Sequence, residues 1–361
     1  MIGSLESPYP LKSASDIELQ KLPQAPWKWK ICESCHNGET CAQSTCSWRL
    51  SARLQTFFDF YKKITSSYLP ELRRPSAPAL SHHDLLDIVN LLRANPNMKR
   101  SDLTGEYFSA REKLRPISDQ HRAINLVVRV MCMINCFAKN QPSGLLELGT
   151  QPVQWHSDKS FAEFISGAFP QTNMGNLRVR DNSGKIRDIK SAISARKLRK
   201  RIDATNGIVE IYYYTSVLRE NLMASQALHS PHSFDHSISA GNIPRQIPLE
   251  ALDSVRQILF PFDSESNQIL RNLVSKESFD PDCLKYDSAI YRKEGEEEVT
   301  YSYFGTRLIQ LFEELEDPSP RGLLGKWFQL KSGARYVMMA THIGVTIAII
   351  LGILGLAVGI F

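Results

Sequence analysis

Apolar residues recur at the spacing of an amphipathic helix along much of the chain, which predicts a mainly helical protein. The segments with this spacing are 50–64, 81–94, 101–108, 118–134, 161–169, 249–260, 264–275 and 304–315. Within 118–134 the apolar residues lie nearly all round the helix, so we expect it to be the buried central helix. Ser81 with Asp84 three residues later predicts a capping box at the start of 81–94.

Only two stretches predict β-structure. Ile208 to Tyr214 is β-branched and aromatic and follows the turn signal Asn206-Gly207, so we expect a strand there. A hairpin is expected within Leu145 to Trp155. The predicted fold class is therefore mainly α with a small β component, an α+β fold, with one C-terminal transmembrane helix.

The transmembrane helix is predicted at residues 336–361. This stretch contains no acidic or basic residue other than His342. A helix rises about 1.5 Å per residue and needs about twenty apolar residues to cross the hydrocarbon core of a bilayer. The span ends the sequence, so we expect insertion of the tail-anchored type, after synthesis.

The flanks of this span predict its orientation. Four cations precede it, Arg321, Lys326, Lys331 and Arg335, and the first thirty residues lack the pattern of a signal peptide. By the positive-inside rule, we expect a membrane protein whose N-terminal domain is cytosolic, in the endoplasmic reticulum or another endomembrane. The lipid bilayer is then its first partner.

Small residues form a seam along one face of the predicted span. They are Gly344, Ala348, Gly352, Gly355 and Gly359, at intervals of three or four. Such spacing lets two helices approach closely and favours a homodimer through the membrane helix. Glycine is also common in membrane spans without any such role, and the pattern leaves both interpretations open.

The composition is that of a globular chain, with 42% hydrophobic and 22% charged residues and a net charge of +5. Breakers and changes of pattern predict six regions. They are an irregular leader at 1–30, a cysteine cluster with an amphipathic helix at 31–69, a linker at 70–80, a cytosolic α-rich domain at 81–317, a basic and aromatic juxtamembrane segment at 318–335, and the membrane helix at 336–361.

Four of the seven cysteines, Cys32, Cys35, Cys41 and Cys46, fall within fifteen residues. Disulfides are disfavoured in the cytosol, so reduced thiols or metal ligands are expected. A Cys-x2-Cys pair followed by two more thiolates predicts a structural zinc site, and four thiolates leave no open position for catalysis. The alternative is a set of reduced thiols beside a packed helix.

Segment 171–205 is strongly basic, with ten basic residues against three acidic ones. Its densest run is Arg196, Lys197, Arg199, Lys200 and Arg201. Such a run can bind phosphates of anionic lipid or of nucleic acid, and a solvated helix face is the alternative. No aromatic residues alternate with these charges, so nucleic acid is not the expected partner.

Two further patterns carry less weight. The order of elements between Ser81 and Trp155 resembles a winged helix. Its recognition helix would be the apolar helix at 118–134, which is expected to be buried, so we expect a protein-packing module rather than a DNA-binding one.

A Ser- and Pro-rich loop contains His229, His232 and His236. Three imidazoles at this spacing could bind zinc, but no helix aligns them on one face. No phosphate-binding glycine loop or nucleophile motif is present, so enzyme activity has no positive support.

Several phrases resemble one known family. They are Arg335 to Ala340, Ile350 to Phe361, Pro318 to Gly322, and Ala123 to Met131. Together they are similar to a large family of uncharacterised filamentous-fungal proteins, from about Ser81 onward. The resemblance implies a cytosolic domain of unassigned function before one membrane helix, and implies no catalytic residues. Members of that family often continue past the span with a short polar tail, which this sequence lacks.

The sequence as a whole predicts a single-pass membrane protein that presents a cytosolic interaction or scaffold domain to a protein partner. The second interpretation is a membrane-tethered nucleic-acid or regulatory binding protein that uses the cysteine cluster and segment 171–205. An enzyme of unrecognised type is the third.

Overall fold

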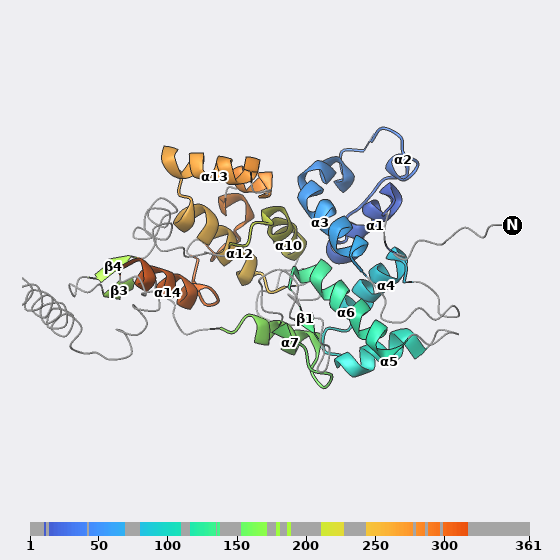
Figure 1. The fold of residues 1–361 in the computed structure, drawn as a ribbon. Coiled ribbons are helices and arrows are strands. Elements are labelled where there is room, and N and C mark those ends of the chain that lie inside the picture. Colours follow the sequence, from blue (N-terminus) through green and yellow to red (C-terminus); the bar gives the residue numbers. More distant parts are fainter. Residues whose placement is uncertain are drawn as a thin grey trace, which may run out of the picture.

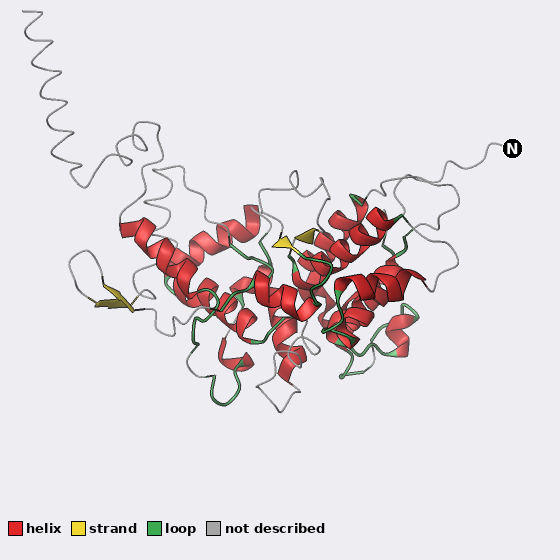
Figure 2. Cartoon of the chain, turned by 90° about the horizontal axis from the view of Figure 1, so that it is seen from below, coloured by secondary structure: helices red, strands yellow, loops and turns green. Residues whose placement is uncertain are grey.

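The computed structural model describes residues 11, 14–41, 43–68, 80–109, 116–134, 136–137, 153–171, 178–180, 186–188, 211–226, 243–276, 279–285, 288–296 and 299–316. These residues form a mainly helical structure with two short pairs of strands (Figure 1, Figure 2). For this part of the chain, the predicted mainly α fold with a small β component is confirmed.

The helices before residue 170 gather in one group and those after residue 240 in another (Figure 1). The first group comprises α1 (Asp16–Trp27), α2 (Glu33–His36), η1 (Ser47–Leu54), α3 (Gln55–Ser66), α4 (His82–Ala94), α5 (Arg100–Ser109), α6 (Ile117–Cys132) and α7 (Phe161–Ala168). The second comprises α12 (Gln246–Asp253), η4 (Ser254–Leu259), α13 (Ser264–Lys276), η5 (Pro281–Leu284), η6 (Ser288–Tyr291) and α14 (Gly305–Glu316). Helix α10 (Thr215–Gln226) lies between them and contacts both.

Capping boxes begin three of these helices. Ser15, Ser81 and Ser160 each accept a hydrogen bond from the backbone N–H three residues later, at 3.3, 3.2 and 3.2 Å. In each case the acidic side chain at that later position accepts from the N–H of the serine. Two of the four N–H groups that a helix start leaves without partners are thereby satisfied. The capping box predicted at Ser81 and Asp84 is confirmed.

Helix α1 corrects the sequence analysis, which placed residues 1–30 in an irregular leader. Residues 16–27 are helical although Pro23 and Pro26 lie inside the helix. A proline in a helix interior costs about 3 kcal/mol or more, because it removes a hydrogen bond and crowds the preceding turn. Burial offsets this cost. Leu19, Leu22 and Trp27 are buried, and the Arg93 guanidinium of α4 donates to the Ala25 carbonyl.

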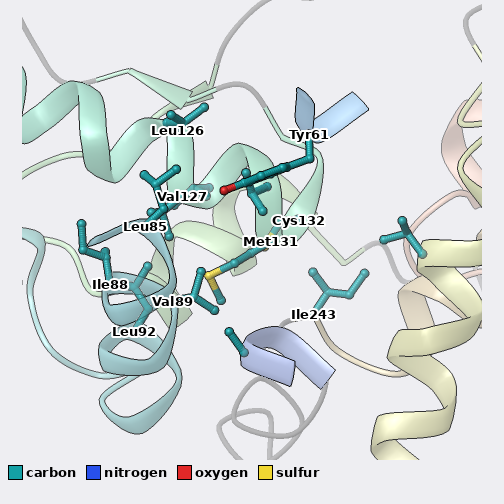
Figure 3. Close-up of a cluster of buried hydrophobic side chains, with 14 of the residues drawn as sticks. Tyr61, Leu85, Ile88, Val89, Leu92, Leu126, Val127, Met131, Cys132 and Ile243 are labelled. Carbon is teal, nitrogen blue, oxygen red and sulfur yellow. The ribbon is translucent and has the colours of Figure 1, made fainter. Parts of the chain in front are cut away.

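The main hydrophobic core lies among α3, α4 and α6. Figure 3 shows side chains from these three helices packed together with Ile243. The labelled members are Tyr61 from α3, Leu85, Ile88, Val89 and Leu92 from α4, and Leu126, Val127, Met131 and Cys132 from α6. Ile124, Val127 and Val128 of α6 are fully buried, and Arg122 and Arg129 are half-buried at its edges, so the predicted buried central helix is confirmed.

A second, smaller core lies in the other group of helices. Its buried side chains come from η4, α13, η5 and α14, together with Phe260 and Tyr301. Leu308, Phe312 and Leu315 of α14 enter it, so the helix predicted at 304–315 is confirmed, although Phe312 is more deeply buried than the predicted Leu311. The two cores meet where α12 continues directly into the π-helical turns of η4.

The strands are short, with two or three residues each. β1 (Cys136–Phe137) pairs with β2 (Val153–Gln154) in parallel, and β3 (Arg178–Arg180) pairs with β4 (Ile186–Asp188) in antiparallel. Of the hairpin predicted within Leu145 to Trp155, residues 145–152 lie outside the described residues. The described end of that stretch pairs in parallel with β1 and so is not one arm of a local hairpin.

The strand predicted at Ile208 to Tyr214 is wrong for the four residues of it that are described, 211–214, which are irregular and lead into α10. These residues are held by contacts between aromatic rings and not by pairing with another strand. The ring of Tyr213 stacks on that of Phe279, with centroids 4.9 Å apart and planes 17° from parallel, and on that of Tyr214 at 4.3 Å. Residues 208–210 lie outside the described part of the chain.

Among the helices described between residues 16 and 316, none combines the length and the apolar character that a bilayer crossing requires. The predicted membrane helix, 336–361, and its juxtamembrane segment, 318–335, lie outside the described residues, and both stay predictions. The division of the chain at a linker over 70–80 also stays a prediction, since only Leu80 of that stretch is described.

Because α1 packs on α4 rather than forming a loose leader, Leu22→Ala should destabilise the folded protein. Leu22 is fully buried, so the loss should be about 2–5 kcal/mol of unfolding free energy. Ile17→Ala on the same helix is the control, because Ile17 is 55% exposed, and it should change stability by less than about 0.5 kcal/mol. Urea denaturation of both variants measures this, and equal, small effects would show that α1 contributes nothing to the core.

Candidate metal centre

The four clustered cysteines are placed by two short helices and the loop between them. Cys32 directly precedes α2, Cys35 lies inside α2, and Cys46 directly precedes η1. Cys41 lies in the loop. Cys32, Cys35 and Cys46 are buried, and Cys41 is half-buried.

This arrangement brings the four sulfur atoms together. All four Sγ atoms lie within 4.8 Å of one another. Cys32 Sγ is 3.8 Å from Cys41 Sγ, and Cys35 Sγ is 3.7 Å from Cys46 Sγ. These separations are far longer than the roughly 2.05 Å of a disulfide, and all four cysteines are free thiols.

Two of these separations match those of a four-thiolate zinc site. A tetrahedral zinc ion holds its sulfur ligands at about 2.3 Å, which places neighbouring sulfurs about 3.8 Å apart. Cys32 with Cys41 and Cys35 with Cys46 already have this separation. The soft thiolate set is also the one that zinc prefers. The predicted ligand set is therefore assembled, and it can hold one metal ion.

The loop between the ligands depends on Gly38. Its N–H donates to the Cys35 carbonyl at 3.2 Å, and its φ of +77° lies in the left-handed region. A residue with a Cβ atom is strained in that region, whereas glycine is not. The turn reverses the chain after α2, so that Cys41 returns toward Cys32.

Hydrogen bonds to sulfur make the four thiols unequal. Burial opposes ionisation of Cys46, but the N–H groups of Cys32 and Trp48 and the neighbouring thiols outweigh it and lower the pKa of Cys46 to about 6. The Cys32 N–H to Cys46 Sγ distance is 3.4 Å. Burial raises the pKa values of Cys35 and Cys41. Cys46 is therefore the sulfur best prepared to act as a thiolate ligand.

Residues distant in sequence attach the cysteine cluster to the rest of the fold. The Gln20 side chain of α1 donates to the Cys35 carbonyl at 2.9 Å, and the Trp48 ring lies 5.8 Å from that of Phe58 in α3. The Trp29 indole N–H donates to Glu220 Oε2 of α10 at 2.9 Å. Sequence reasoning missed Gln20 and Glu220, because nothing in their local pattern indicates a partner elsewhere.

The other predicted site residues lie outside the described residues. They are the basic run Arg196, Lys197, Arg199, Lys200 and Arg201, the small-residue seam Gly344, Ala348, Gly352, Gly355 and Gly359, and the loop histidines His229, His232 and His236. Within the described part of the chain, the four cysteines are the one group of three or more histidine, cysteine or acidic side chains placed to hold a metal.

Comparisons with models of known protein families, with curated proteins and with solved structures gave no match to this chain. The resemblance to the fungal family therefore stays a prediction, and function has to be argued from the chain's own residues.

Replacing the turn glycine should disturb the metal centre. We expect Gly38→Ala to cost about 1–2 kcal/mol of stability, because alanine is strained at a φ of +77°. Gly105→Ala is the matched control. Gly105 lies inside α5 with open space around it, so alanine there should stabilise the helix by about 0.5–1 kcal/mol.

Thermal unfolding of the two variants beside the unchanged protein measures the contrast. Equal melting temperatures for Gly38→Ala and the unchanged protein would show that the turn between the cysteines is not built as described.

Proposed function

We propose that this chain is a membrane-anchored interaction protein whose N-terminal segment is fixed by a structural zinc ion. The observation that carries the proposal is the convergence of four free thiols at the sulfur separations of a tetrahedral site. Cys32, Cys35, Cys41 and Cys46 are the ligands.

The chemistry of this ligand set favours a structural role. Catalytic zinc keeps one coordination position for water or substrate, whereas four thiolates fill a tetrahedral ion completely. The cluster has a small apolar surrounding of its own, formed by Ile31 and Trp48. A zinc ion supplies cross-links that such a small core lacks, and metal binding then contributes directly to folding.

The membrane part of the proposal rests on the sequence of residues 336–361, which is long and apolar enough to span a bilayer. The cations Arg321, Lys326, Lys331 and Arg335 on its N-terminal side favour a cytosolic position for the helical body. Reduced thiols agree with that compartment, because disulfides are rare in the cytosol.

The proposed partners follow from this placement. The bilayer holds the membrane helix, the seam from Gly344 to Gly359 supports a homodimer, and the cytosolic helices bind a protein partner. The carbonate-extraction experiment below tests the association with the bilayer.

Purified protein should contain about one zinc ion per chain, and Cys35→Ser should reduce this to near zero. Cys283→Ser is the matched control, because Cys283 is buried but lies in the second core away from the cluster. Elemental analysis of the three proteins gives the zinc content. A content near zero in the unchanged protein, purified without chelators, would exclude the zinc site.

Full-length protein with an N-terminal tag should resist extraction from membranes by alkaline carbonate. A version lacking residues 332–361 should be soluble, because it lacks the apolar span. In intact microsomes the N-terminal tag should be accessible to added protease. Carbonate release of the full-length protein would contradict the anchor, and a protected tag would contradict the cytosolic orientation.

A further inference from the structure

A cavity lies between the two groups of helices, away from the cysteine cluster. Its volume is about 610 Å³, within the range of small-molecule binding sites. One wall comes from η1 and α3, and the other comes from the segment before α10, the end of α13 and η5. Sites for small ligands commonly form at such junctions between parts of a fold.

Aromatic rings form much of its lining. They are Phe60, Tyr213, Tyr214 and Phe279. Phe279, Tyr213 and Tyr214 form a continuous stack, and Phe60 meets Tyr214 edge-on with centroids 5.2 Å apart. Aromatic surfaces of this kind favour a ligand that contains a planar ring.

The carboxylates that line the cavity already have partners. Asp280 accepts from the N–H groups of Ser216 and Asp282, at 2.8 and 3.0 Å. Asp282 is paired with Arg219, in a fully buried contact. Asp59 accepts from the Gln55 side chain at 2.9 Å. Only Asp282 has a cationic partner among the described residues, since Asp280 and the exposed Asp59 accept from uncharged groups.

The cations that line the cavity outnumber the two carboxylates, Asp59 and Asp280, that have no cationic partner among the described residues. Arg53, Lys63 and Lys285 line it, and all three are exposed. Among the described residues, none forms an ion pair with their side chains. They contribute three positive charges to the lining of the cavity.

The tyrosine hydroxyl groups of the lining add a hydrogen-bond donor. Tyr213 donates its hydroxyl hydrogen to the oxygen of Tyr214 at 2.9 Å, which leaves the hydrogen of Tyr214 able to point elsewhere. Burial raises the pKa of Tyr214, so this hydroxyl keeps its proton at neutral pH. A neutral tyrosine and three cations together suit the oxygens of a phosphate group.

We propose that this cavity binds a small phosphorylated molecule that contains a planar ring, of the mononucleotide class. The ring lies against the aromatic lining, and the phosphate lies toward Arg53, Lys63, Lys285 and the Tyr214 hydroxyl. Tight binding requires both the ring and the phosphate of the ligand, because the aromatic side chains contact only the ring and the cations contact only the phosphate. The site is independent of the zinc centre and of the membrane anchor.

The test is isothermal titration of the full-length protein in detergent with AMP, adenosine and inorganic phosphate. AMP should bind, and adenosine and phosphate should each bind at least about tenfold more weakly, because each lacks one of the two interactions. Higher salt should weaken AMP binding, since phosphate contacts with exposed lysines are screened.

Lys63→Ala should weaken AMP binding about tenfold, which is the effect of losing one charge-assisted contact. Lys62→Ala is the control, because Lys62 is an equally exposed neighbour on α3 that does not line the cavity. Both residues are at the surface, so both variants should fold normally, as circular dichroism can verify.

Three outcomes would overturn the proposal. The first is an absence of AMP binding up to about 1 mM, which is weaker than ligand-binding cavities usually achieve. The second is phosphate binding as tightly as AMP, which would remove the role of the rings. The third is an equal loss in Lys62→Ala and Lys63→Ala, which would place the phosphate elsewhere.

Discussion

The buried charges of α10 hold the parts of this fold in one arrangement. Arg219 and Glu220 are both about 4% exposed, and each has a partner from a different part of the chain. Arg219 pairs with Asp282 of η5, and Glu220 accepts from the indole of Trp29, just before the cysteine cluster. Removing one member of a buried pair costs about 3–5 kcal/mol, because the remaining charge is left without compensation in a poorly solvating interior. The two groups of helices therefore have little freedom to pack differently.

The same helix relates the two sites to each other. At its N-terminal end, Ser216 binds Asp280 through both its hydroxyl and its N–H, which fixes one wall of the cavity. One turn later, Glu220 fixes Trp29 and so the chain that enters the cysteine cluster. Burial raises the pKa values of both Asp280 and Glu220, and their hydrogen bonds act in the opposite direction. Helix α10 therefore holds both a wall of the cavity and the segment that precedes the cysteines.

The sequence predicted those features whose cause is local. Amphipathic spacing identified α3, α4, α6 and α14, because a helix that packs on one side repeats its apolar residues every three to four positions. The cysteine spacing identified the candidate metal ligands, since the four residues lie close together in the chain. Helix α1 was missed because Pro23 and Pro26 indicate a break, although Ser15 and Glu18 carried the capping signal. The tyrosines before α10 were assigned to a strand because β-propensity does not distinguish pairing from aromatic stacking. Helix α10 was not predicted, and nothing local in the sequence indicates that Arg219 and Glu220 have distant partners.

The link between Trp29 and Glu220 has a consequence for synthesis of the chain on the ribosome. The two residues are 191 positions apart, so at about 5–20 residues per second Glu220 emerges about 10–40 s after Trp29. The cysteines, by contrast, are all made within a second or a few of one another. All four cysteines are therefore made long before the residue that anchors their segment to α10.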